Sequence, residues 1–114
     1  MTDCPFCRIA SGELAARIAY QDEQVTAFHD LHPAAPMHVL LVPNRHISGV
    51  GEIAAEDEPV LGHLLRVAGQ VAREQGVGER GYRLVINTGP DAGQVVMHLH
   101  MHLLGGRGLG WPPG

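Results

Sequence analysis

A strictly alternating run near the C-terminus constrains the fold of this chain more than any other segment. His98, His100 and His102 are separated by single apolar residues. On a helix, residues two apart point to different sides, whereas on a strand they share one face and lie roughly 7 Å apart. The run therefore predicts a strand over residues 95–104 with the three histidines on one face. The apolar side chains on the other face are expected in the core: Met97, Leu99, Met101 and Leu103.

Most other predicted elements are short, because Gly and Pro punctuate the sequence. Residues 4–12 favour a short helix ending at Gly12. Residues 31–37 and 88–94 have the composition of loops and turns, residues 47–55 are expected to be irregular or a short helix, and the tail from residue 105 to 114 is expected to be irregular. Four further segments are β-branched or aliphatic and predict strands: 16–20, 24–28, 38–43 and 82–87.

One long amphipathic helix is expected over residues 56–76, with Pro59 in its first turn and Gly76 at its end. Several strands and one long helix, without repeated β-α-β alternation, indicate an α+β fold with a largely antiparallel sheet. The helix stripe expected to face the core comprises Leu61, Leu64, Leu65, Ala68, Val71, Ala72 and Gln75.

Length and composition narrow the class of protein. The 114 residues fit one domain, residues 1–114, and 45% hydrophobic with 18% charged residues excludes a disordered chain. The sequence contains neither a transmembrane run nor a signal peptide, so a cytoplasmic protein without a membrane partner is expected. The net charge of −4 argues against a nucleic-acid partner, since duplex binding needs a basic surface.

Histidine is unusually frequent, with eight residues against eight Lys and Arg together. Imidazole titrates near neutrality and is a common metal ligand, so this composition favours chemistry or metal binding. Three interpretations of the triple-histidine strand remain open: a polar solvent face, a metal site, and nucleophilic and acid–base catalysis on a phosphate.

These residues also match a known family. The run HLHMHLL resembles the signature of the histidine triad superfamily, and further segments resemble its Hint branch, the purine nucleoside phosphoramidases. They are FHDLHPAAPMHVLLVPNRHI, GYRLVINTG, DAGQ and WPPG. The resemblance runs from about residue 4 to residue 114. It implies a HIT-like fold: a mainly antiparallel five-stranded sheet, one long helix, a short N-terminal helix, and a sheet continued across a homodimer.

The resemblance assigns catalytic roles to four histidines. His100 would attack the phosphorus of a nucleoside 5′-phosphoramidate and form a nucleotidyl-histidine intermediate. The backbone carbonyl of His98 would hold the other ring nitrogen of His100 as a donor. His102 would contact the phosphate and protonate the departing amine. His38 matches a fourth histidine that contacts the same cluster, although a structural histidine at a strand end is the alternative.

Substrate contacts follow from the same resemblance. Asp30 would accept hydrogen bonds from the ribose hydroxyls, and Trp111 from the tail would shape the leaving-group side. Val95 stands where many members have Ser, and valine cannot donate a hydrogen bond. The remaining expected contacts are amide donors to phosphoryl oxygens at Asn87 and Gln94, a close backbone approach at Gly93, and a purine pocket at Phe28, His29 and Leu31.

The two cysteines form a C-x-x-C pair, Cys4 and Cys7. In an intracellular chain such a pair favours metal or redox chemistry over a structural disulfide. Some bacterial triad proteins complete a structural zinc site with two histidines, which match His46 and His98 here. A pair of reduced, metal-free thiols is the alternative, and the resemblance implies no catalytic metal.

The sequence thus predicts a hydrolase of purine nucleoside 5′-phosphoramidates that binds purine nucleoside monophosphates and forms a homodimer. Three alternatives stay open. They are a Fhit-like dinucleoside polyphosphate hydrolase, a nucleotide-binding regulatory protein with incidental activity, and a plain zinc-binding protein.

Overall fold

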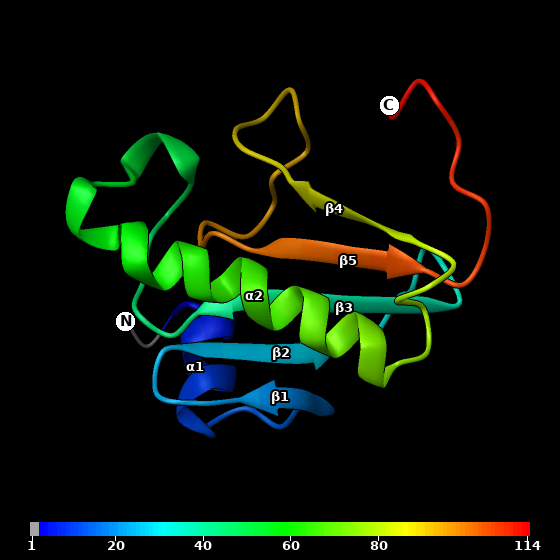
Figure 1. Cartoon of the computed structure of the whole chain (residues 1–114). Helices are drawn as coiled ribbons and strands as arrows, with labels where there is room; N and C mark the ends of the chain where they lie inside the picture. Colours follow the sequence, from blue (N-terminus) through cyan, green and yellow to red (C-terminus); the bar gives the residue numbers. More distant parts are fainter. Residues whose placement is uncertain (1–2) are drawn as a thin grey trace.

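The computed structural model describes residues 3–114 and is built around a five-stranded sheet in the order β1-β2-β3-β5-β4 (Figure 1). Every neighbouring pair of strands is antiparallel. The predicted α+β fold with a mainly antiparallel five-stranded sheet is therefore confirmed. The strands are β1 (Ile18–Gln21), β2 (Val25–His29), β3 (Met37–Pro43), β4 (Tyr82–Ile86) and β5 (Met101–Gly105).

Two helices lie on opposite faces of this sheet. The long helix α2 (Glu58–Glu74) covers β2, β3 and β5, and the short helix α1 (Pro5–Ser11) lies behind β1 and β2 (Figure 1). Gly12 ends α1 with φ of +86°, a left-handed conformation that a side chain would strain. Two short 3-10 helices, η1 (Val50–Glu52) and η2 (Ala55–Asp57), lead into α2. The predicted long helix and short N-terminal helix are both confirmed.

The strand β3 is buried on both faces because a helix covers each side of it. Val39 and Leu41 belong to the apolar cluster beneath α2, whereas Leu40 and Val42 pack with Phe6 and Cys4 on the α1 side. Side chains alternate along a strand, so successive residues serve different layers. His38 shares the α1 face with Leu40, which places it away from the main core.

The core-facing stripe of α2 differs from the predicted one at two positions. Leu64, Ala68, Val71 and Ala72 are buried as expected, and Val67 joins them. Leu65 is 55% exposed and Gln75 is exposed. The i, i+3, i+4 pattern alone allows residues on either side of the stripe to face the sheet. Because α2 lies over β3, Val67 faces the core and Leu65 lies at the edge of the contact.

The last strand is shorter at its start than predicted. It begins at Met101 rather than at residue 95, and Met97 is 54% exposed instead of lying in the core. Pairing with β4 stops at Met101 because β4 ends at its partner, Ile86, and pairing with β3 stops at the same residue, at Leu41. Without strand partners, the preceding residues take other hydrogen bonds. At the far end, Gly105 belongs to β5, so the irregular tail begins one residue later than expected.

The strand β4 forms one edge of the sheet and is not covered by α2. Its side chains on the α2 face are apolar and exposed: Tyr82, Leu84 and Ile86. Within residues 3–114, no helix has the length and apolarity needed to cross a membrane.

Two adjacent leucines of α2 test the packing directly. Leu64 is 1% exposed and Leu65 is 55% exposed. Leu64→Ala should lower the free energy of unfolding by about 2–5 kcal/mol, since it removes buried methyl groups and leaves a cavity. Leu65→Ala, the matched control, should change it by roughly 0.5 kcal/mol or less. Urea unfolding measures both, and equal losses would contradict this placement of α2.

Candidate active site

A cavity of about 480 Å3 opens on the α1 face of the sheet. That volume is typical of small-molecule sites. Most of its wall is apolar, and its polar groups are mainly histidines and one carboxylate. The lining residues include Phe6, Ile9, Leu14, Phe28, His29, Asp30, Leu31, Val95, His100 and His102.

His100 is held in one orientation by the backbone. Its Nδ1 lies 2.8 Å from the carbonyl oxygen of His98, and a carbonyl can only accept, so Nδ1 carries the proton. In the neutral ring, Nε2 is then the nitrogen with the lone pair. The ring lines the cavity, and the Phe6 ring packs edge-on against it with a centroid distance of 5.0 Å. A buried, unprotonated imidazole nitrogen at a cavity wall can act as a nucleophile.

His38 and His102 form a hydrogen-bonded pair beside His100. The backbone N–H of Ala34 donates to Nδ1 of His38 over 3.0 Å, so the proton of His38 is on Nε2. This Nε2 lies 2.8 Å from Nδ1 of His102, which accepts. The proton of neutral His102 is consequently on Nε2. The ring centroids of His100 and His102 are 5.2 Å apart, so the predicted nucleophile and the predicted proton donor lie side by side.

The electrostatics of the site disfavour positive charge on these rings. Burial, together with the neighbouring His100 and His38, lowers the pKa of His102 from its ordinary value to about 4. Burial also lowers the pKa of His38. The carboxylate of Asp30 acts in the opposite direction on both rings. Its Oδ2 lies 3.5 Å from Nε2 of His38.

The predicted base-binding residues lie at the same cavity. Phe28 is buried in its wall, and Leu31 is exposed at its rim. His29 is half-buried, and its pKa is lowered by burial and by the positive charge of Arg17. Val95 is 86% exposed and also lines the cavity. The structure therefore brings together predicted residues from β2, the following loop, and the approach to β5.

Four other predicted residues do not line this cavity: Asn87, Gly93, Gln94 and Trp111. Gln94 was expected to donate to a phosphoryl oxygen, but its side-chain amide donates to the carbonyls of Ser48 and Val96. Its Oε1 accepts from Gly89 N–H. The Gln94 side chain thus braces the 88–94 turn. Trp111 is exposed in the tail, and the guanidinium carbon of Arg83 lies 6.0 Å from its ring.

The two cysteines and two histidines meet in a second cluster next to the cavity. Sγ of Cys4 lies 3.2 Å from Nδ1 of His98, and Sγ of Cys7 lies 3.4 Å from Nδ1 of His46 and 3.5 Å from Nδ1 of His98. All four donor atoms lie within 4.8 Å of one another. His98 donates from Nε2 to the Pro43 carbonyl over 2.8 Å, which leaves its Nδ1 lone pair facing the sulfurs. The predicted four residues are therefore assembled, and they could hold a metal.

Sequence reasoning missed the contribution of the N-terminal segment to the cavity. Phe6, Ile9 and Leu14 line it, together with Arg17 and Val96. Phe6 and Ile9 are three residues apart, so they share a face of α1. That spacing was a usable signal, but the sheet face against which the helix packs was not visible from it.

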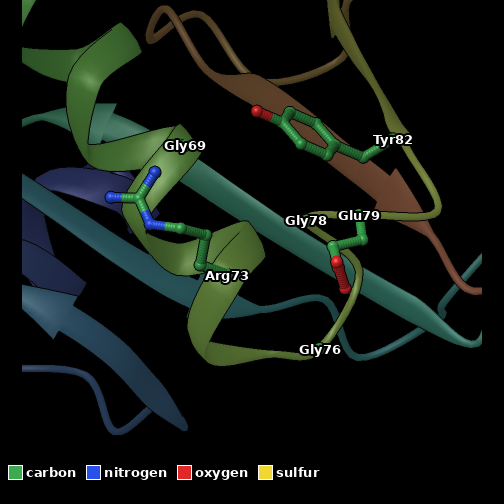
Figure 2. Close-up of a pocket in the computed structure, with 6 residues that line it drawn as sticks. All are labelled: Gly69, Arg73, Gly76, Gly78, Glu79 and Tyr82. Atoms are coloured by element: carbon green, nitrogen blue, oxygen red, sulfur yellow. The ribbon is translucent and has the colours of Figure 1, made fainter.

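A second cavity, of about 450 Å3, lies between the end of α2 and the start of β4 (Figure 2). Its lining contains Arg73, Glu79, Tyr82 and three glycines, and no histidine. It is separate from the histidine cluster, so we place the chemistry at the first cavity.

The hydrogen bonds predict one tautomer for each ring of the site. In 15N NMR spectra at pH 7.5, His100 should be protonated at Nδ1, and His38 and His102 at Nε2, because their other nitrogens accept or face the cavity. An Nε2-protonated His100 in the native protein would contradict the proposed orientation.

Known proteins similar to this chain include HIT family hydrolases, in agreement with a cavity lined by histidines. The HIT domain family model matches residues 11–109. The purine nucleoside phosphoramidase of Escherichia coli K12 is 49% identical over 105 residues, covering 92% of this chain and 88% of that protein. A HIT family hydrolase from Legionella pneumophila superimposes with a TM-score of 0.96 at 43% identity, covering 98% of this chain and 100% of that one. A HIT family hydrolase from Clostridium thermocellum gives 0.94 at 46% identity, with 96% of each chain covered.

The family match spans most of the chain, and the identity and coverage of these hydrolases are high. This chain is therefore an enzyme that belongs to the HIT domain family.

Proposed function

We propose that this enzyme hydrolyses the P–N bond of purine nucleoside 5′-phosphoramidates through a covalent nucleotidyl-histidine intermediate. The observation that carries the proposal is the orientation of His100, whose Nδ1 is committed to the His98 carbonyl while the ring lines the cavity. The similar Escherichia coli protein is a purine nucleoside phosphoramidase, which supports the substrate class.

In the first step, Nε2 of His100 attacks the phosphorus, and the P–N bond breaks. The leaving nitrogen takes a proton from Nε2 of His102, because a neutral amine leaves far more readily than an amide anion. The His98 carbonyl stabilises the positive charge that develops on the His100 ring through the Nδ1–H bond of 2.8 Å.

In the second step, water attacks the phosphorus, and the bond to His100 breaks. His102 accepts the proton of the attacking water, and nucleoside monophosphate leaves. Splitting the reaction into two displacements lowers each barrier. Val95 at the rim offers no hydrogen bond to the leaving group, so the rate and the choice of amine depend on the other cavity residues.

The nucleoside is expected to occupy the apolar end of the cavity. Phe28, Ile9 and Leu31 present apolar surface that suits a flat purine, and Asp30, which lines the same cavity, would accept from the ribose hydroxyls. Apolar contact reads shape more than the base edges, so adenine and guanine are both accommodated in this proposal.

The activity is tested by removing the nucleophile. His100→Ala should lower kcat on adenosine 5′-phosphoramidate by at least about 10³-fold, with AMP affinity changed by less than about tenfold. His63→Ala removes a histidine of α2 on the far side of the sheet and serves as the control. The measurements are AMP release and trapping of labelled nucleotide on acid-quenched protein.

Turnover of diadenosine polyphosphates with none on the phosphoramidate would overturn the proposed substrate class. AMP binding without turnover on either would indicate a regulatory binder instead.

We also propose that Cys4, Cys7, His46 and His98 hold a structural zinc ion. Two thiolates and two imidazoles form a common zinc set, and bond lengths of about 2.3 Å to sulfur and 2.05 Å to nitrogen at a tetrahedral angle imply an S···N separation of about 3.6 Å. The three S···N distances of 3.2, 3.4 and 3.5 Å are close to that value. Four protein ligands leave no open position, so such an ion would crosslink α1 to the approach of β5 without taking part in the reaction.

Metal analysis tests this site. The purified protein should contain about one zinc per chain, and Cys4→Ser should lose most of it and unfold at lower temperature, because a ligand is removed. His32→Asn, an exposed histidine outside the cluster, is the control. Full zinc retention in Cys4→Ser would overturn the ligand set.

A homodimer with a continued sheet completes the proposal. The edge strand β4 presents free backbone groups and the exposed apolar side chains of Tyr82, Leu84 and Ile86. An edge of this kind is suited to pairing with another strand.

A further inference from the structure

The proton donor of the site is a pair of rings and not a single histidine. Nε2–H of His38 donates to Nδ1 of His102 over 2.8 Å, and Ala34 N–H occupies Nδ1 of His38. With one proton on each ring, loss of the His102 Nε2 proton would leave the pair one proton short. The pair can act as an acid at modest cost only when it holds one additional proton, which has to sit on Nδ1 of His38 in place of the hydrogen bond from Ala34 N–H.

The surroundings of the pair oppose this additional proton. His38 is buried, and His102 is largely enclosed. His100 faces His102 from the approach to β5, and Arg107 of the tail donates to the Ala34 carbonyl over 3.0 Å. The burial of the two rings excludes water, and His100 and Arg107 add positive charge nearby when they are protonated. None of these features stabilises a cation on the pair.

Asp30 is the group that can compensate. Its Oδ2 lies 3.5 Å from Nε2 of His38, and its Oδ1 accepts the backbone N–H of His32 over 2.8 Å. Its own backbone N–H donates to the His38 carbonyl over 3.0 Å, which fixes the carboxylate beside the pair. Among the described residues that line the cavity, Asp30 is the only acidic one.

We propose that Asp30 is a positioning residue for the acid, the counter-ion that retains the transferable proton on the His38–His102 pair. This inference rests on the proposed function and adds a second task to the expected contact with ribose. The proton passes from Nε2 of His102 to the leaving nitrogen, which keeps the electron pair of the broken P–N bond, and the Nε2 proton of His38 moves to Nδ1 of His102, so both rings end neutral. Water returns a proton to His102 in the second step, so the pair ends as it began.

The two tasks of Asp30 predict different kinetics. Loss of a sugar contact weakens binding and raises KM. Loss of a counter-ion lowers the pH at which the pair gives up its additional proton, so kcat should fall at neutral and alkaline pH and recover as the pH is lowered.

The experiment measures kcat and KM between pH 5 and 9 for adenosine 5′-phosphoramidate with the native enzyme, Asp30→Asn and Glu13→Gln. In Asp30→Asn, the alkaline limb of kcat should move down by about one pH unit or more, which is about tenfold in kcat above the midpoint. Asparagine retains an oxygen for the His32 N–H. Glu13→Gln removes an exposed carboxylate near the cavity and should keep the native profile.

A second substrate separates the sugar contact from the proton. The native enzyme acting on the 2′,3′-dideoxyadenosine analogue should show a raised KM with the native pH profile of kcat. A superimposable profile for Asp30→Asn, or a dideoxy profile that matches that of Asp30→Asn, would overturn the proposal.

A measurement without turnover keeps this inference separate from the proposed activity. By NMR, the ring signals of His38 and His102 should titrate at lower pH in Asp30→Asn than in the native protein. An absence of phosphoramidase activity in the native enzyme would refute the proposed function. The NMR titration would then still test whether Asp30 retains the proton on the His38–His102 pair. Unchanged titration midpoints would refute the role of Asp30 whatever the activity.

Discussion

The carbonyl oxygen of His98 accepts the Nδ1–H of His100, and the chemistry proposed for the cavity depends on this bond. A carbonyl that points elsewhere would free the ring to rotate or to change its tautomer. The segment around it is fixed on both sides: the ring of His98 donates to Pro43 and faces the cysteines, and Leu99 N–H donates to the Ile47 carbonyl over 2.6 Å. Each net contribution is about 1 kcal/mol, but together they restrict the backbone to one conformation.

The alternation of the triple-histidine run predicted the division of the sheet into two faces correctly. Leu99, Met101 and Leu103 lie in the core beneath α2, and His102 faces the other way with Leu40. The pleat of a strand is a local property, so sequence alone reveals it. The start of β5 depends on where its pairing with β3 and β4 stops, which is a property of other segments, and the predicted strand was therefore too long. The same reasoning explains the helix stripe, where periodicity could not distinguish Leu65 from Val67.

Only part of the candidate site was predicted, because some of its residues meet only through the packing of distant segments. The family resemblance supplied the histidines, Asp30 and the cysteine cluster, in which Cys4 and His98 lie 94 positions apart. The residues of α1 were missed, because their contribution arises only when the helix packs against β2 and β3. Gln94 stays a prediction: its amide chemistry suits a phosphate, and in this structure the 88–94 turn uses that amide internally.

The two-faced strand β3 has a consequence for how such a protein could diversify. Its odd-numbered residues, Val39 and Leu41, contribute to the core beneath α2, and its even-numbered residues, His38 and Leu40, face the layer that contains the candidate cavity. Substitutions that retune ligand choice can therefore accumulate on one layer with little thermodynamic penalty in the other. An insertion or deletion of one residue within β3 would exchange the two sets and abolish both properties at once.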